Sequence, residues 1–320
     1  MHAEIHLVYS SHRPETIGLT THLMEDSDLI ILEEPPHPDF TKMLCASIPI
    51  DDFLLEQDIE YPEFSFQQYS LLQQLSSAGK TILQVEPFLQ HLLEIHMFFA
   101  AGHSPQELDR GSLLYQIYSA EHNATARLIH FYQSSTRDEF DQIVIAVNEF
   151  AQADAERLRL RDTLRAEKIL SVLANMKKKT FIEAGPIHFY LEQLLCRNHR
   201  ETANLTITNV DQKALRKLGT SGNLFSPGDE LTLYHQMQNS NQSSQTKLLA
   251  ARALIYNKIV CKEEITESTS LYPHVQNEYE SIRFANTLSY KDCEKVFSAI
   301  RFLSTQRSLE YVEQFSKTRS

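Results

Sequence analysis

Five short apolar segments lie along the chain, and the stretches between them have the residue spacing of helices. The segments cover residues 4–9, 28–32, 81–85, 180–184 and 204–208. Apolar runs of this length are typical of strands that are buried on both faces of a parallel sheet. Strands that alternate with helices favour right-handed βαβ crossovers. The pattern therefore predicts an α/β fold with a mainly parallel sheet flanked by helices.

The longest interval between two of these segments has no strand pattern. Helical spacing occurs in three parts of it, residues 106–120, 122–132 and 137–176. The last part is either one long helix or two helices joined by a kink. Because this block is too long for a plain crossover, we expect an α/β core domain, 1–220, that contains a helical insertion at about 87–176. Residues 221–320 are expected to form a helical C-terminal region packed on the core.

The composition excludes several classes of protein. Hydrophobic residues make up 42% of the 320 residues and charged residues 22%, which is typical of a soluble globular protein. The chain has 30 Lys and Arg against 42 Asp and Glu, and the resulting net charge of −12 repels nucleic acid. No apolar run approaches the ~20 residues that span a bilayer, so no membrane partner is expected.

The N-terminus and the cysteines indicate a cytoplasmic protein. The chain begins with acidic and histidine residues, where a secretory signal would have a basic start and an apolar core. The four cysteines are far apart and form no CxxC, which disfavours a disulfide framework and a thiolate zinc site. We therefore expect free thiols in a reducing compartment.

Histidine and glutamate residues follow four of the predicted strands. In chain order they are His12, Glu33, Glu34, Glu86 and His188. In an open parallel sheet, ligands bind at the carboxyl ends of the strands, so these side chains are expected to meet at one edge. We predict that both imidazoles face one cleft and that at least one of the three glutamates lies within hydrogen-bonding reach.

The candidate catalytic groups are His12, Glu33, Glu34 and His188. A neutral imidazole can take a proton from water or ligate a metal, and a carboxylate can orient it or share the ion. The candidate metal ligands are His12, Glu33 and His188. Because side chains alternate along a strand, Glu33 and Glu34 are expected to point in opposite directions, and Glu33 continues the apolar run more directly. The alternatives stay open: a surface loop for His12, a solvated turn for the glutamate pair, and a helix-entry carboxylate for Glu86.

Four residues are candidates for contact with a substrate, namely Arg13, Glu86, Arg161 and Gly185. Gly185 ends the fourth predicted strand, where glycine permits a tight turn or the close approach of a ligand. Arg161 shares a helix face with Arg165, so one of the two could reach an anionic substrate. No GxGxxG, P-loop or GxSxG motif occurs, so common nucleotide sites and an ordinary serine hydrolase are not indicated.

At these same residues the chain resembles the broad superfamily of erythromycin esterase-like, ChaN-like and TraB-like proteins. That superfamily has two GxxH motifs, the first followed by a glutamate at the end of the next strand. The second motif matches Gly185-Pro186-Ile187-His188, and the first corresponds to Tyr9-Ser10-Ser11-His12, with tyrosine where the family has glycine. The family's glutamate falls on Glu33 or Glu34, and its RD-containing helix looks like Arg161-Asp162. The resemblance covers roughly residues 4–200.

The resemblance implies the fold more than the reaction, because the superfamily includes macrolide-ester hydrolases, metal-dependent Tiki-type proteases and a haem-binding lipoprotein. Our leading expectation is a hydrolase in which His12 and His188, with Glu33 or Glu34, activate water directly or through a divalent metal. The alternative is a non-enzymatic binding or regulatory protein that captures a small ligand, with haem as one candidate. The expected partner is a small molecule or a peptide, and a homo-oligomer is compatible with the sequence.

Overall fold

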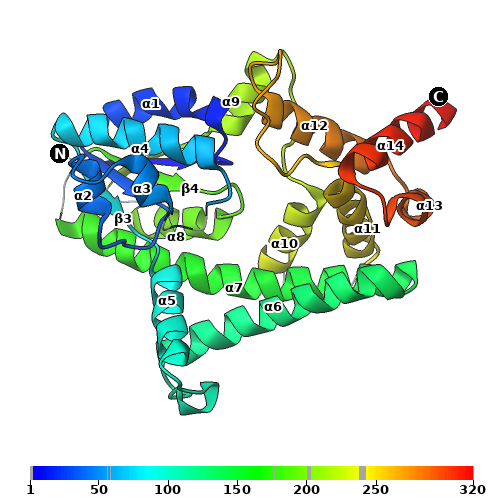
Figure 1. Cartoon of the computed structure of the whole chain (residues 1–320), viewed down its shortest axis with the longest axis horizontal. Helices are drawn as coiled ribbons and strands as arrows, with labels where there is room; N and C mark the ends of the chain where they lie inside the picture. Colours follow the sequence, from blue (N-terminus) through cyan, green and yellow to red (C-terminus); the bar gives the residue numbers. More distant parts are fainter. Residues whose placement is uncertain are drawn as a thin grey trace. The chain divides into compact units, whose positions relative to one another are not determined.

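A parallel β-sheet forms the centre of the fold. The structure is a computed structural model that describes residues 3–55, 57, 59–175, 178–199, 203–237 and 243–319. Within these residues five strands form one sheet in the order β3-β2-β4-β1-β5, and all neighbouring strands are parallel (Figure 1). The strands are β1 (Ala3–Tyr9), β2 (Leu29–Leu32), β3 (Thr81–Gln84), β4 (Thr180–Ala184) and β5 (Ala203–Asn209). They coincide with the five predicted segments, so the predicted α/β fold with flanking helices is confirmed.

Strand β4 lies between β1 and β2, although it follows both by a long interval of sequence. Ile182 of β4 pairs with Leu7 of β1 and with Ile31 of β2. The last pairs of the β1–β4 ladder place Tyr9 opposite Ala184. The segments that follow β1, β2 and β4 therefore leave the sheet at the same end, the end formed by the carboxyl termini of the strands.

The side chains of the central strands alternate between two layers of helices. On one face, Leu7, Ile31 and Ile182 belong to a buried cluster with residues of α7 (Phe140–Asn175) and α8 (Phe189–His199). On the opposite face lie α1 (Ile17–Glu25) and α4 (Pro62–Ser77) (Figure 1). Successive side chains just after a strand are thus expected to point alternately to one helical layer and to the other.

Short helices and tight turns complete this α/β region. Helix α4 begins at Pro62, a favoured first residue, and is followed by Gly79 with φ 85°, the left-handed conformation expected just past a helix end. The other short elements are η1 (Pro14–Thr16), α2 (Phe40–Leu44), α3 (Ile50–Leu55) and α9 (Val210–Lys217).

The described residues between β3 and β4 contain helices and no strand, as expected, but the helix boundaries differ from the prediction. It contains α5 (Pro87–Ala100), η2 (Pro105–Glu107), α6 (Leu113–Arg137) and α7. The predicted break between residues 120 and 122 is wrong, because α6 runs through it and buries Ala124 one turn later. Helix α7 is a single helix of 36 residues. In the described part of the chain, no helix is both long enough and apolar enough to cross a membrane.

The chain divides into two compact units. Unit 1 comprises Met1–Ile117, Arg159–Ser221 and Thr266–Tyr272, and it contains the sheet. Unit 2 comprises Tyr118–Leu158, Gly222–Ile265 and Pro273–Ser320. The segment predicted as a helical insertion therefore contributes residues to both units, and most of the predicted C-terminal region lies in unit 2.

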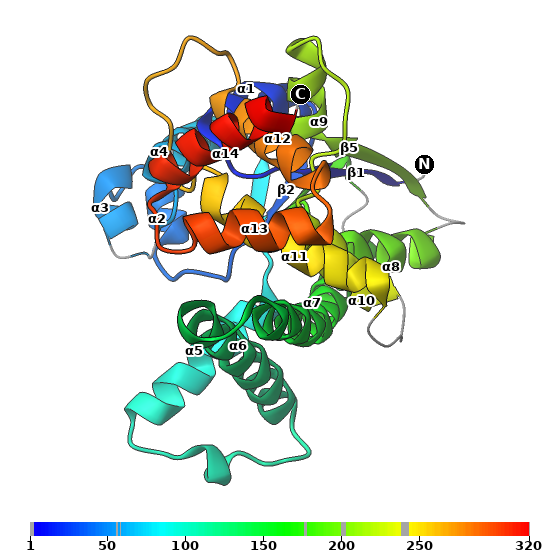
Figure 2. The same cartoon turned by 90° about the vertical axis from the view of Figure 1, so that its right-hand side faces the viewer.

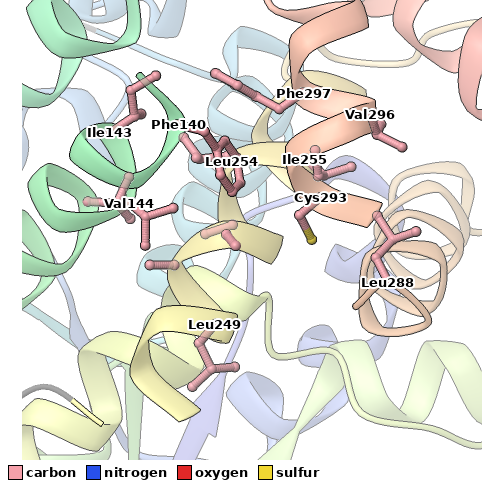
Figure 3. Packing of buried hydrophobic residues seen from close by; sticks show 14 of the residues in the cluster. Phe140, Ile143, Val144, Leu249, Leu254, Ile255, Leu288, Cys293, Val296 and Phe297 are labelled. Atoms are coloured by element: carbon pink, nitrogen blue, oxygen red, sulfur yellow. The ribbon is translucent and has the colours of Figure 1, made fainter. Parts of the chain in front are cut away.

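Unit 2 has a core of its own. Besides parts of α6 and α7 it contains α10 (Pro227–Met237), α11 (Ser244–Ile259), α12 (Pro273–Asn286), α13 (Tyr290–Ile300) and α14 (Thr305–Arg319). Helix α11 contacts the other four of these helices. Figure 3 shows Leu254 of α11 in one buried cluster with Val144 of α7 and Phe297 of α13. Burial of such side chains is the main stabilising contribution to a helical unit without a sheet.

Candidate functional site

Glu33 and Glu34, which follow β2, lie on opposite faces of the sheet. Glu33 accepts a hydrogen bond from Nη2 of Arg161, on α7, at 2.8 Å. Glu34 instead accepts from the hydroxyl of Tyr69, on α4, at 3.1 Å and from Nε2 of Gln84 at 2.8 Å. The alternation expected from the strand thus continues past its end and separates the two carboxylates.

Glu33 is the centre of a set of charged side chains that we call the buried ion cluster. Its members are Glu33, Glu86, Arg161, Asp162, Arg165 and His188. Oε1 of Glu33 lies 2.7 Å from Nε2 of His188, and Oε2 accepts from the backbone N–H of Gly185 at 2.6 Å. Nη1 of Arg165 lies 3.2 Å from the same Oε2. Burial alone would raise the pKa of Glu33, but His188, Arg165 and Arg161 hold it well below its ordinary value.

His188 is held between two carboxylates. Its Nδ1 contacts Asp162 while its Nε2 contacts Glu33, and only 3% of the side chain is exposed. Carboxylates at both ring nitrogens favour a ring in which both nitrogens carry a proton. Burial opposes the charged ring, but Glu33 and Asp162 together raise its pKa to about 9. The two carboxylates thus favour the imidazolium form of His188, and in that form the ring has no lone pair for base catalysis or metal ligation.

The two arginines of the cluster contact carboxylates and carbonyl oxygens, although Nε of Arg161, Nη1 of Arg165 and both oxygens of Glu86 form no hydrogen bond. Nε of Arg161 lies 3.1 Å from Glu86, a carboxylate with no solvent exposure. Arg165 donates to the carbonyl oxygen of Val85 at 3.0 Å and to that of Glu183 at 2.6 Å. The three carboxylates of the buried ion cluster balance its two guanidinium groups and one imidazolium. Contact between Arg161 and an anionic substrate stays a prediction, and in this structure Arg161 is paired with Glu33 and Glu86.

His12 lies outside the buried ion cluster, among polar residues of the other helical layer. Its Nε2 is buried and lies 3.5 Å from Oε1 of Glu183, whereas 31% of the side chain remains exposed. Within the described residues Nδ1 of His12 forms no hydrogen bond, and the ring packs against Phe64 of α4 with centroids 5.2 Å apart. Burial lowers the pKa of His12, but the charges of Glu183, Glu33 and Glu34 outweigh it and raise the pKa to about 8.

Glu183 contacts His12 and was not among the candidate site residues of the sequence analysis. It belongs to β4, and its carboxylate accepts from Nε2 of Gln68 at 2.8 Å and from the backbone N–H of Glu33 at 3.3 Å. Both oxygens are thereby fixed, and one of them faces His12. We call His12, Gln68, Glu183, Glu34, Tyr69 and Gln84 the His12 cluster. A charged residue inside the apolar segment TFIEA is the signal that could have identified Glu183.

The loop that carries His12 is fixed by hydrogen bonds to α9. The backbone N–H and the hydroxyl of Ser11 donate to the two oxygens of Asp211 at 3.0 and 2.9 Å. The N–H of His12 donates to the hydroxyl of Ser10 at 3.2 Å. These contacts hold His12 at φ 54°, a left-handed conformation that residues other than glycine adopt only when their surroundings impose it.

Glu34 has an environment of its own within the His12 cluster. Burial and the nearby charge of Glu183 raise its pKa to about 7, although the hydrogen bonds from Gln84 and Tyr69 act in the opposite direction. Burial and the Glu34 charge also raise the pKa of Tyr69, which keeps that hydroxyl protonated as a donor. Glu34 therefore changes its charge in the neutral range, close to His12.

Arg13 and Gly185 are the other two residues that were predicted to contact a substrate. The guanidinium of Arg13 is buried and lies over the ring of Tyr61, 4.0 Å from its centroid. A Cβ built on Gly185 would lie 3.5 Å from the ring of His188, which is ordinary van der Waals contact. The structure thus brings Glu33, Glu86, Arg161, Gly185 and His188 together, and it places His12, Arg13 and Glu34 among different partners.

A divalent metal at His12, Glu33 and His188 does not fit this arrangement. Both nitrogens of His188 face carboxylates, and both oxygens of Glu33 face N–H donors. Among the residues that the structure describes, no group of three or more His, Cys, Asp and Glu side chains is placed to hold a metal ion. The metal expected from the sequence is not supported, and we assign no chemical step to one.

The chain is similar to an uncharacterised protein of Archaeoglobus fulgidus. The two are 27% identical over 292 residues, which cover 91% of this chain and 97% of the archaeal protein. The similarity therefore extends over most of both units. No family model matches the chain, and no solved structure matches it. This relative is itself uncharacterised, so the similarity assigns no function to the chain.

Proposed function

We propose that this protein is a hydrolase of the erythromycin esterase-like, ChaN-like and TraB-like type in which His12 is the general base. The observation that carries the proposal is the pairing of His12 with Glu183, in which the buried Nε2 lies 3.5 Å from Oε1 without forming a hydrogen bond, while 31% of the His12 side chain is exposed. A carboxylate at one ring nitrogen keeps the proton there and leaves the lone pair on the other nitrogen. The assignment of His188 as a second base is replaced by a positioning role.

In this mechanism Nδ1 of neutral His12 removes a proton from a water molecule while the water oxygen attacks the carbonyl carbon of an ester. The Nε2–H group stays directed at Glu183, whose negative charge stabilises the imidazolium that forms. The tetrahedral intermediate expels the alcohol oxygen, which takes the proton back from Nδ1. The products are a carboxylic acid and an alcohol, and His12 returns to its neutral state.

The buried ion cluster supports this base indirectly. His188, Arg161 and Arg165 fix the carboxylate of Glu33, and the backbone N–H of Glu33 in turn donates to Glu183 at 3.3 Å. Glu183 is therefore oriented through residues that do not touch the substrate. In the resembled superfamily these positions correspond to the second histidine motif and the glutamate that follows the first.

A panel of ester, peptide and phosphoester substrates, assayed with and without a chelator, tests the proposal. We expect ester hydrolysis that the chelator does not change. H12A should lower kcat by about 10²–10⁴-fold, the usual contribution of a general base. E183Q should lower kcat with a smaller effect on KM, because in this mechanism Glu183 acts through His12.

H91A is a matched control for H12A. His91 pairs with Glu94 at 2.9 Å and its side chain is 30% exposed, close to the exposure of His12, but it lies on α5. We expect H91A to retain full activity. Activity that survives in H12A, or no hydrolysis of any of the three classes, would overturn the proposal. Ligand binding without turnover, including a Soret band from bound haem, would favour the non-enzymatic alternative.

A further inference from the structure

Strand β5 is an edge strand that lacks the usual protection against pairing with another chain. It pairs with β1 on one side, and among the described residues no strand pairs with its other side (Figure 2). It is seven residues long, and its sequence, ANLTITN, contains neither charge nor proline. Free N–H and C=O groups of a long edge strand bind other strands, so natural edges are ordinarily short or carry lysine or proline.

The opposite edge of the same sheet has both of these protections. Strand β3 is only four residues long. Its first residue, Thr81, accepts a hydrogen bond from Nζ of Lys178 at 3.0 Å, and Lys80 directly precedes the strand. The two edge strands of the sheet therefore differ in length and in the lysines beside them.

We propose that β5 pairs antiparallel with β5 of a second copy of this chain, about a two-fold axis at Thr206. In that register Leu205 of one copy lies opposite Ile207 of the other, and Thr206 lies opposite its own counterpart. Apolar pairs and Thr–Thr pairs across antiparallel strands are both favourable. The sequence of the strand is thus complementary to itself when it is reversed, as a two-fold interface requires.

Exposure and charge both favour a second copy as the occupant. Ile207 is 42% exposed, although it is a large aliphatic residue in a strand, and the pairing would cover it with Leu205 and Ile207 of the other copy. Each chain carries a net charge of −12, so two copies repel one another over most surfaces. Strand β5 itself contributes no charge to such a contact.

Sedimentation velocity of the full chain tests this pairing. We expect wild type to approach twice its mass of 36.9 kDa as the concentration rises from about 1 to about 100 µM, the range in which weak contacts become populated. Thr206 is exposed, so T206K and T206E are expected to fold normally. Each variant places like charges opposite one another at the axis and should weaken dimerisation by about tenfold or more.

An equal mixture of T206K and T206E should dimerise again, because a lysine then faces a glutamate across the axis. T41K is the matched control, since it adds the same charge at an exposed threonine of α2 and should dimerise like wild type. A wild type that stays monomeric over the whole range overturns the proposal. A dimer that persists unchanged in T206K, or no recovery in the mixture, also overturns it. These outcomes do not depend on whether the protein is a hydrolase.

Discussion

The backbone N–H of Glu33 donates to Oε2 of Glu183 at 3.3 Å, and this hydrogen bond joins the buried ion cluster to the His12 cluster. Oε1 of the same Glu183 carboxylate faces Nε2 of His12. The orientation of His12 therefore depends on where Glu33 is held, and Glu33 is held by His188 and two arginines. Substitutions in the buried ion cluster should affect the proposed base without touching it.

Replacement of His188 should be far more costly to folding than replacement of His12. H188A removes one cation from a buried set of balanced charges and leaves Glu33 and Asp162 under-neutralised, which should lower the free energy of unfolding by about 3–5 kcal/mol. H12A should lower it by about 1 kcal/mol or less, because the ring is partly exposed. Urea unfolding followed by circular dichroism measures both values. H188Q keeps one donor and should fall between H188A and wild type, whereas equal stability of H188A and wild type would exclude a buried imidazolium.

The rate of hydrolysis should rise with pH through the titration of His12. The imidazole acts as a base only when it is neutral, and its pKa is raised to about 8 by the surrounding carboxylates against the effect of burial. We therefore expect kcat/KM to increase from pH 6 to a plateau above about pH 9. E183Q removes the principal charge that raises this pKa, so the midpoint should move to lower pH. A profile with no inflection between pH 6 and 9 would rule out His12 as the titrating base.

The stability of the protein should fall as the pH rises from about 6.5 to about 9. The pKa values of His12 and His188 are raised to about 8 and about 9 in the folded state, above the ordinary value of 6.5. The folded state then binds more protons than the unfolded state, and the stability that this provides is complete below 6.5 and is lost above the folded pKa. Thermal unfolding in a series of buffers measures the trend. H188Q should flatten it, and an unchanged slope in H188Q would assign it to other groups.

E34Q should lower the pKa of His12 while the fold is preserved. The Glu34 charge is one of those that raise the pKa of His12, and the amide removes it. Gln84 can still donate to the amide oxygen, and the hydroxyl of Tyr69 can reverse to accept from the amide nitrogen. NMR titration of the His12 ring protons measures the shift. An unchanged pKa of His12 would show that Glu34 is already uncharged over this range.

The sheet could be predicted from the sequence because its strands are short, apolar and separated by helical stretches. That Glu33 and Glu34 point in opposite directions could also be predicted, since side-chain alternation is a local property of a strand. The break that we predicted near residue 121 was wrong: the segment has no proline or glycine to end a helix, and α6 continues through it with Ala124 buried.

The partners of His188 could not be predicted from local sequence. Asp162 lies on α7 and Glu33 follows β2, far from His188 in the chain, and only the packing of α7 on the sheet brings both to the ring. Glu183 was not predicted for a related reason: the candidate residues were those that follow a strand, whereas Glu183 lies inside β4. A buried charge within an apolar segment requires partners, and that requirement is itself a sequence signal.

The equality of positive and negative charges in the buried ion cluster constrains how these six positions can vary over time. Loss of Arg165 alone leaves Glu33 and Glu86 under-neutralised inside the protein, whereas simultaneous loss of an arginine and a glutamate restores neutrality. The effects of such changes are therefore strongly non-additive. Related sequences that depart from this set are expected to do so in charge-matched pairs, so covariation among these positions would reveal the cluster even where each residue has been replaced.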